Sequence, residues 1–212
     1  MLELDAVTIA SPQRVLVRGL TARIAPGEVL AVMGESGAGK SSLLAMLAGT
    51  LPDGFVASGE VRLDGVRIDT LPTVRRHVAL LYQDDLLFPH MTVLENLLFA
   101  LPAGPRAARV SEAHGALANA GLDGLGARWP HQLSGGQRAR VSVLRALLAK
   151  PRAVLLDEPF SRLDAALRLR FRQFVFERIA GQRIPAVLVT HDPNDVPPGA
   201  PVVELRGEAG DA

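Results

Sequence analysis

Eight consecutive residues carry the clearest chemistry in the sequence. They match the phosphate-binding pattern G-x-x-x-x-G-K-S/T and are Gly34, Glu35, Ser36, Gly37, Ala38, Gly39, Lys40 and Ser41. The glycines allow a backbone in which successive N–H groups point inward and form a concave anion site. Lys40 supplies a mobile charge for the β- and γ-phosphates of a nucleotide, and the Ser41 hydroxyl suits Mg²⁺. We therefore predict a phosphate-binding loop that continues into Ser42; the alternative is a glycine-rich turn that binds nothing.

An acidic pair follows the apolar residues 153–156. A carboxylate at the end of a strand beside a phosphate loop can hold Mg²⁺ directly or through water, and Asp157 has this position. The adjacent Glu158 could accept a proton from an attacking water molecule. The alternative is a pair of acids that caps a helix on the surface.

A second candidate anion site is formed by Ser134, Gly135, Gly136 and Gln137, before a predicted helix at 138–149. Ser134 can cap this helix, and the two glycines leave its first N–H groups open, which favours anion binding. Since one ATP molecule needs only one phosphate loop, the second site suggests a phosphate shared with another copy of the chain. An ordinary Ser-Gly-Gly helix start is the alternative.

Four short apolar segments, at 28–33, 78–82, 153–157 and 186–190, should position these groups. Continuous apolar runs are typical of strands buried on both faces, so we predict an α/β fold with a mostly parallel sheet. The ligands of such sheets bind beyond the carboxyl ends of the strands. The residues that follow these strands should therefore meet on one rim; they are the loop from Gly34, Gln83, Glu158 and His191.

The other segments should form an antiparallel flap and a helical lobe. Residues 2–9 and 15–24 alternate apolar and polar side chains, and 59–68 has the pattern of a hairpin with an Asp-Gly turn. Helices are predicted at 41–48, 91–101, 106–120 and 164–180. The helix at 91–101, capped by Thr92, and the helix at 106–120 interrupt the alternation of strands and helices, so we expect an inserted lobe.

The composition limits the possible classes of protein. The chain has 212 residues, a formal net charge of +1 and no cysteine. Near-neutral charge argues against a general nucleic-acid binder, and the lack of cysteine excludes disulfides and cysteine-based metal sites. The acidic, alternating N-terminus does not resemble a signal peptide, and no apolar run is long enough to cross a bilayer. We expect a soluble, cytoplasmic chain that reaches a membrane only through a partner.

Five motifs occur in an order that is typical of one family. They are the phosphate loop, Gln83, Leu133–Gln137, Asp157-Glu158-Pro159 and His191. This set resembles the ATP-binding subunits of bacterial ABC importers and, through Gln83–Phe88 and Asp157–Asp164, their YnjD-like group. The resemblance implies a single domain, 1–212, with a P-loop NTPase core of the RecA type, that is, the ABC ATPase fold. The core and its antiparallel flap would comprise 1–83 and 151–212, and the helical subdomain 84–150.

The resemblance also implies a role for each motif residue. Lys40 would bind the β- and γ-phosphates, and Ser41 and Asp157 would hold Mg²⁺. Glu158 would be the catalytic base. Gln83 would touch Mg²⁺ and the attacking water and would sense the membrane partner.

Other residues would act at the γ-phosphate or across a dimer. Ser134 and Gly136 would clasp the γ-phosphate bound to the opposite subunit, Asp164 would lie at the dimer seam, and His191 would contact the γ-phosphate. The implied function is hydrolysis of ATP, with Mg²⁺, by a homodimer that drives a membrane permease for solute import. The permease would dock near Gln83 and the helical subdomain, and a solute-binding protein would complete the system, with no nucleic-acid partner.

Three other functions fit parts of the sequence. A non-transport ABC ATPase would usually carry coiled-coil arms or tandem cassettes, and a P-loop kinase would have no need for residues 133–137. An ABC regulator at the membrane that moves no solute stays open.

The sequence departs from the family pattern at the base site. The family usually stacks adenine on an aromatic residue in the first flap turn, but this turn is Ser11–Arg14 and has no ring. We therefore expect Pro12, Arg14 and Val15 to pack against the base, with weaker nucleotide affinity or a looser choice of base.

Overall fold

The computed structural model describes residues 1–161, 163 and 165–205, and of residue 166 only the backbone. The chain forms two compact units. The first contains Met1–Leu80, Arg152–Glu158 and the described residues from Arg178 onward; the second contains Leu81–Pro151 and Pro159–Glu177 within the same limits. None of the helices in this described part of the chain combines the length and the apolar character that crossing a membrane requires.

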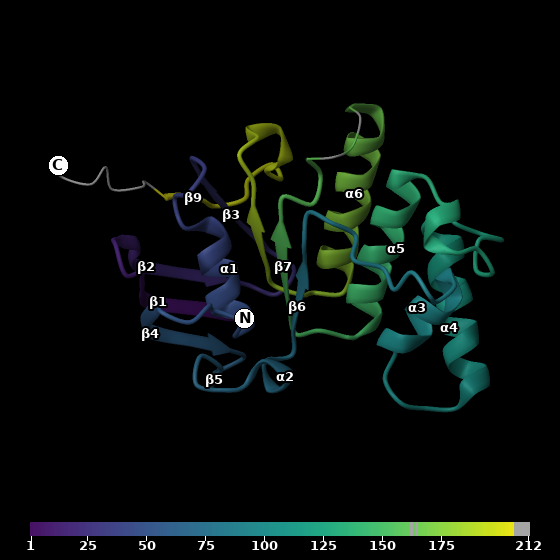
Figure 1. Ribbon diagram of the computed structural model, residues 1–212, viewed down its shortest axis with the longest axis horizontal. Coiled ribbons are helices and arrows are strands. Elements are labelled where there is room, and N and C mark those ends of the chain that lie inside the picture. Colours follow the sequence, from purple (N-terminus) through teal and green to yellow (C-terminus); the bar gives the residue numbers. More distant parts are fainter. Residues whose placement is uncertain (162, 164, 206–212) are drawn as a thin grey trace. The chain divides into compact units, whose positions relative to one another are not determined.

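A five-stranded sheet organises the first unit (Figure 1). In the order β6-β7-β8-β3-β9, its strands are Val78–Leu81, Ala153–Asp157, Ala186–Val189, Val29–Gly34 and Val202–Leu205. Strand β3 is parallel to β8 and β9, and β7 is parallel to β8. Every residue of β8 and the first four residues of β7 are buried, which confirms the predicted parallel sheet; β6 is only partly buried.

An antiparallel sheet of four strands completes the first unit. In the order β2-β1-β4-β5, its strands are Val15–Ile24, Leu2–Ala10, Val56–Leu63 and Val66–Arg67. Strand β1 pairs with both β2 and β4, so the predicted flap forms. Strand β4 begins at Val56, three residues before the predicted start of the hairpin at residue 59. The β4–β5 turn is Asp64-Gly65, and both residues have a positive φ, 50° and 78°, as a tight hairpin turn requires.

Helix α1 (Lys40–Ala48) lies between the two sheets (Figure 1). Leu43, Leu44 and Leu47 are buried in a core that they share with strands of both sheets. The helix ends at Gly49, whose φ of 79° closes the last turn in the left-handed conformation. The predicted helix is confirmed, with its first turn beginning at Lys40.

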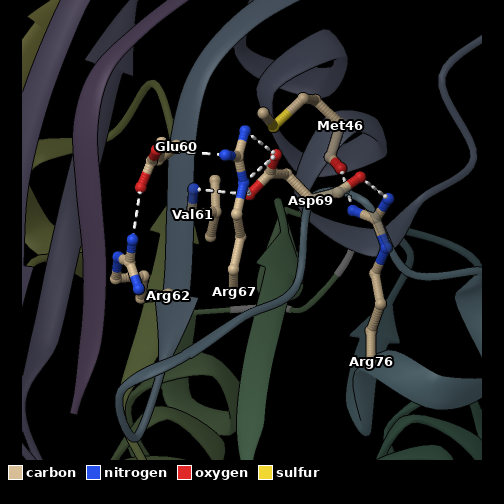
Figure 2. Close-up of polar contacts among 7 residues, drawn as sticks. All are labelled: Met46, Glu60, Val61, Arg62, Arg67, Asp69 and Arg76. Atoms are coloured by element: carbon tan, nitrogen blue, oxygen red, sulfur yellow. Dashed lines mark hydrogen bonds and ion pairs between the residues drawn. The ribbon is translucent and has the colours of Figure 1, made fainter.

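The carboxyl end of α1 is held by a buried arginine at the end of the short helix α2 (Thr73–Arg76). Figure 2 shows the Arg76 side chain beside Met46 and Asp69. Its Nη1 donates to the carbonyl oxygens of Met46 and Leu47, at 2.6 and 3.2 Å. Its Nη2 donates to the carbonyl oxygen of Asp69 at 2.8 Å. The bonds to Met46 and Leu47 supply donors at the last turn of α1, where carbonyl groups have no partner within the helix; the Met46 oxygen also accepts from the N–H of Gly49.

The Asp69 carboxylate extends this network into the β4–β5 hairpin (Figure 2). The Nε and Nη2 of Arg67 donate to it at 3.0 Å, and the backbone N–H of Val61 donates at 2.9 Å. Burial opposes ionisation of Asp69, but these hydrogen bonds outweigh burial and hold the pKa of the carboxyl below its ordinary value. The network therefore ties the hairpin to the end of α1.

The second unit is built from helices (Figure 1). They are α3 (Val93–Ala100), α4 (Arg106–Asn119), α5 (Gly135–Leu148) and the part of α6 (Ala165–Gly181) that ends at Glu177. Helices α3, α4 and α5 share a core that includes Leu97, Leu117 and Val141. Thr92 caps α3 as predicted: its side chain accepts from the N–H of Glu95, whose carboxylate accepts from the N–H of Thr92. Two short 3₁₀ turns, Pro130–Gln132 in this unit and Pro193–Asp195 in the first, complete the described elements.

The two units differ from the division implied by the resemblance in residues 81–83, in Pro151 and, as the largest segment, in the described residues of 159–177. That division places 151–212 with the core and 84–150 in the helical part. In the structure, the described residues of 159–177 belong to the second unit. Phe174 of α6 packs against the helical core, which explains why this stretch associates with the helices.

Candidate functional site

The phosphate loop follows β3 and opens α1. Lys40, the first residue of α1, is buried, and its Nζ donates to the carbonyl oxygens of Gly34 and Glu35, both at 2.8 Å. Gly39 precedes the helix with a φ of 94°. A Cβ at Gly39 would lie 2.8 Å from the Cβ of Leu16, so glycine alone fits both the conformation and the space. The loop has the shape of an anion cradle at a helix N-terminus.

A cavity of about 450 Å³ opens on this loop. Its described lining residues from the loop and α1 are Ser36, Gly37, Gly39, Lys40, Ser41 and Ser42. The others are Ser11, Gln13, Arg14, Leu16, Phe55, Glu158 and His191. All of them belong to the first unit. The structure therefore brings the phosphate loop together with Glu158 and His191 around one cavity.

Asp157 ends β7, and its carboxylate accepts a hydrogen bond from the Ser41 hydroxyl. Burial raises the pKa of Asp157, and the charge of Glu158 raises it further, while the Ser41 bond and the Lys40 charge act in the opposite direction. A cation beside this carboxylate would favour its ionised form. Hydroxyl and carboxylate oxygens are ligands that Mg²⁺ prefers, so Ser41 and Asp157 fit a magnesium ion.

Glu158 and His191 follow β7 and β8, and their side chains meet. The Nδ1 of His191 lies 3.2 Å from Oε1 of Glu158. The backbone of Glu158 has a φ of 45°, and its N–H donates to the carbonyl oxygen of Val189 at 3.0 Å. A left-handed conformation is unfavourable for a residue with a side chain, so the surrounding structure must hold it. The result is a carboxylate and an imidazole side by side at the cavity.

Gln83 belongs to the second unit, where it lines a cavity of about 300 Å³ together with Gly135 and Arg138. Its Nε2 donates to the Ser161 hydroxyl at 3.1 Å. The segment after Gln83 is fixed to α5, because Arg138 forms an ion pair with Asp85 at 2.8 Å. The structure therefore joins Gln83 to the beginning of α5.

Ser134 caps α5, as expected. Its Oγ accepts from the N–H of Gln137 at 3.3 Å, and the Oε1 of Gln137 accepts from the N–H of Ser134 at 2.9 Å. The helix begins at Gly135, earlier than the predicted start at 138, because this reciprocal capping fixes the first turn in spite of the glycines. Gly136 is buried, and a Cβ there would collide with the Leu167 side chain of α6.

The flap side of the cavity departs from the sequence-based expectation. Of the residues expected to pack against a base, Arg14 lines the cavity, whereas Pro12 and Val15 are not among its described lining residues. Phe55, which lies outside the flap turn and is not among the residues expected to pack against the base, also lines the cavity. No motif marks Phe55, because it reaches the cavity through the fold and not through a fixed spacing from the phosphate loop. The remaining predicted site residue, Asp164, lies outside the described residues.

Sequence comparison finds that this chain is similar to ATP-binding proteins of ABC transporters. The family described as ABC transporter matches residues 17–161. An uncharacterized ABC transporter ATP-binding protein of Escherichia coli K12, YnjD, is 46% identical over 97% of this chain and 95% of its own. The thiamine import ATP-binding protein ThiQ of Shigella flexneri is 42% identical over 80% of this chain and 72% of its own. The Fe(3+) ions import ATP-binding protein FbpC of Rhizobium etli is 41% identical over 83% of this chain and 50% of its own.

Structural comparison agrees with these relatives. The ATP-binding cassette MJ0796, solved as a dimer in a post-hydrolysis state with ADP and Pi, is similar with a TM-score of 0.81. It is 28% identical, and the match covers 98% of this chain and 97% of that one. The predicted ABC ATPase fold is confirmed. On sequence and on structure, this chain belongs to the ATP-binding proteins of the ABC transporter family.

Proposed function

We propose that this chain hydrolyses ATP as one half of a homodimer and thereby drives a membrane permease that imports a solute. One observation carries the proposal: the phosphate loop shares a single cavity with the neighbouring side chains of Glu158 and His191. An anion cradle, a carboxylate and a further donor around one space are what transfer of a phosphoryl group to water requires. The relatives named for import of thiamine and of ferric ions support the direction of transport.

In the proposed reaction, the phosphate loop and Lys40 hold the β- and γ-phosphates of the substrate ATP. The Lys40 ammonium is already oriented by two loop carbonyl groups, so little reorganisation accompanies binding. Bound Mg²⁺, held by Ser41 and Asp157, would neutralise charge on the phosphates. Glu158 orients the attacking water and accepts its proton, and His191 donates a hydrogen bond to the γ-phosphate.

A second copy of the chain would complete the site. The first turn of α5, capped by Ser134, is a helix N-terminus of the kind that binds anions, and it belongs to the second unit. In the proposed dimer, this turn of one copy closes over the γ-phosphate held by the other, with Asp164 at the seam. Hydrolysis removes the shared γ-phosphate, and the dimer opens. The dimeric state of the MJ0796 cassette with ADP and Pi supports this arrangement.

The permease would dock on the second unit, near Gln83 and α3. Phe88 makes an edge-to-face contact with Phe99, with ring centroids 4.9 Å apart, and the guanidinium of Arg145 lies 5.2 Å over its ring. Phe99 and Leu86 are 64% and 54% exposed, so this surface presents two large apolar side chains to solvent. Exposed apolar patches often mark sites where another protein binds. We infer that a cytoplasmic helix of the permease covers this surface, and that the Gln83 segment passes its movement to α5. Recovery of one particular membrane protein together with this chain from its native membrane tests the partner.

The variant Glu158→Gln tests the proposed chemistry. Its amide keeps the shape of the side chain but cannot accept a proton, so ATP turnover should fall by about 100-fold or more. Binding of ATP should persist, and dimers should accumulate with ATP but not with ADP, because the shared γ-phosphate is no longer removed. Steady-state turnover, equilibrium nucleotide binding and light scattering measure the three effects.

The matched control is Glu204→Gln. Glu204 is exposed on β9 and is not among the described residues that line the cavity. This variant should turn over ATP at the wild-type rate and should form no more dimer than the wild type. If Glu158→Gln also hydrolyses ATP at the wild-type rate, Glu158 is not the base.

A further inference from the structure

The cavity on the phosphate loop has one carbocyclic ring among its described lining residues. That ring is Phe55, which no motif assigns to the site. The phosphates of the proposed ATP would occupy the part of the cavity at the loop and α1. They would leave the part beside Ser11, Gln13 and Arg14 of the flap turn for the rest of the nucleotide. The family pattern places the base of the nucleotide at this flap turn, where this chain has no aromatic residue. Phe55 therefore lies on the cavity whose base site lacks its usual ring.

The fold brings Phe55 to the flap. The chain leaves α1 at Gly49 and turns at Pro52, where the N–H of Phe55 donates to the carbonyl oxygen of Pro52 at 3.3 Å. The turn touches the flap, since a Cβ at Gly54 would lie 3.6 Å from Cγ of Pro12. The residue after Gly54 is Phe55, and β4 begins immediately behind it. The turn between α1 and β4 thus places the Phe55 ring near the flap turn, although the two are far apart in the sequence.

Packing restrains this ring before any ligand binds. Phe55 is half-buried: it packs against the core of the first unit and also lines the cavity. A side chain that is already ordered loses little conformational entropy when a ligand stacks on it. This combination suits a binding platform better than a fully exposed ring would.

Arg14 fixes the flap turn in position relative to the phosphate loop. Its Nη2 donates to the carbonyl oxygen of Gly37 at 2.8 Å, so the flap turn is tied to the loop. The Ser11 hydroxyl accepts from the N–H groups of Gln13 and Arg14, at 3.3 and 3.2 Å, which orders the turn itself. Arg14 also offers a planar cation, and such a cation can stack on an aromatic base. The phosphate loop therefore determines the position of the phosphates, and the flap turn that is bonded to it determines the position of the base.

We propose that Phe55 is the residue on which the adenine base of ATP stacks in this chain, with Arg14 on the flap side. The inference rests on the proposed binding of ATP at the phosphate loop and goes beyond it by assigning the base subsite. It also replaces the expectation of weak nucleotide affinity, because a ring is present although it comes from outside the flap. Stacking uses the face of the base and not its edge, so Phe55 should bind adenine and guanine nucleotides alike.

The test compares ATP with inorganic tripolyphosphate, each with Mg²⁺, because tripolyphosphate has the phosphates but no base. Phe55→Ala should weaken the binding of ATP by about 10- to 100-fold, as expected for the loss of one base–aromatic stack. It should leave the binding of tripolyphosphate unchanged. Phe55→Trp should retain ATP affinity, and in a Trp129→Phe background the fluorescence of its single tryptophan should change when ATP binds. Val56→Ala is the matched control, since Val56 is adjacent and 68% exposed.

Each result separates the proposal from its alternatives. Equal weakening of ATP and tripolyphosphate by Phe55→Ala would show that Phe55 only supports the fold, and unchanged ATP affinity would show that the base lies elsewhere; either overturns the proposal. A wild-type chain that binds neither ligand would instead overturn nucleotide binding at the phosphate loop itself. Thermal unfolding of each variant without ligand reports separately whether the fold is retained.

Discussion

At the scale of the residue, the site contains a carboxylate, that of Asp157, whose ionised form the protein disfavours. The carboxylate of Asp157 is partly buried and lies beside Glu158, and both effects raise its pKa. Ionised Asp157 therefore reduces the free energy of unfolding when no cation is present. A position that is unfavourable for a bare carboxylate is favourable once Mg²⁺ supplies the opposite charge.

Asp157→Asn should stabilise the chain in the absence of metal at neutral pH. The penalty from Asp157 exists above its folded-state pKa and disappears as the pH falls through that pKa towards the unfolded value of 3.8. The advantage of the variant over the wild type should consequently be largest at neutral pH and should shrink on acidification. Thermal unfolding in the presence of a chelator, at several pH values, measures this difference.

The control for this prediction is Asp5→Asn, because Asp5 is exposed on β1. Substitution at this exposed position should change the stability of the chain little. Asp157→Asn should also lose most of the extra stability that ATP with Mg²⁺ gives to the wild type. A metal-free wild type that is more stable than Asp157→Asn at neutral pH would contradict this account of Asp157.

The sequence predicts residues of the site when their spacing is local or when a general rule of sheets applies. Lys40 and Ser41 follow from one motif, and Glu158 and His191 follow from the rule that parallel strands present their carboxyl ends at one edge. Phe55 follows from neither. Its place depends on how the turn after α1 packs on the flap, and no periodicity or motif reports that contact.

At the scale of the element, the site depends on α1, whose two ends have separate supports. Its first turn forms the phosphate loop, and its last turn ends at Gly49. The guanidinium of Arg76 donates to four carbonyl oxygens, which belong to Met46, Leu47, Asp69 and Leu71. Figure 2 shows the contacts with Met46 and Asp69. One side chain thus holds α1, the hairpin after β4 and the segment before α2 together.

Arg76→Ala should destabilise the first unit strongly. It removes a buried guanidinium that donates to four carbonyl oxygens, of which only that of Met46 is shown to keep another donor, the Gly49 N–H; this should reduce the free energy of unfolding by about 3 kcal/mol. For a chain of this size, the melting temperature should fall by roughly 6–12 °C. Thermal and urea unfolding measure the effect.

Two further variants make this prediction specific. Arg75→Ala alters the neighbouring, exposed arginine and should change the melting temperature by no more than about 1–2 °C. Arg76→Lys keeps the charge but not the fork of donors, so it should lie between the wild type and Arg76→Ala. Equal stability of Arg75→Ala and Arg76→Ala would mean that Arg76 does not hold the end of α1.

The elements are largely predictable, and the exceptions have physical reasons. Helix α5 starts earlier than predicted because the capping by Ser134 and Gln137 outweighs the low helix propensity of the glycines. Strand β9 is not predicted at all. It has four residues, of which only Leu205 is buried, so its sequence lacks the continuous apolar run of the inner strands; its pairing with β3 defines it.

At the scale of the whole molecule, function in this account needs two copies of the chain. The described lining of the phosphate cavity comes from the first unit, whereas Ser134 and the start of α5 belong to the second. The sequence alone suggests this sharing, because it contains two anion-binding patterns for one nucleotide. It does not predict that the described residues of 159–177 associate with the helices, since the apolar pattern of this stretch fits either core.

Mixing two inactive variants tests the shared site most directly. Lys40→Ala removes the ammonium of the phosphate loop, and Ser134→Glu places a negative charge where the γ-phosphate of the other copy should lie. Each homodimer then has two defective sites. A mixed dimer has one intact site, which combines the phosphate loop of the Ser134→Glu chain with the Ser134 turn of the Lys40→Ala chain.

The measurement is ATP turnover by each variant alone and by their equimolar mixture. The account predicts almost no turnover by either variant and recovery in the mixture of up to about a quarter of the wild-type rate, because half of randomly formed dimers are mixed and each has one working site of two. Wild-type turnover by Ser134→Glu alone, or a mixture as inactive as its components, would contradict the claim that ATP is cleaved between two copies of this chain.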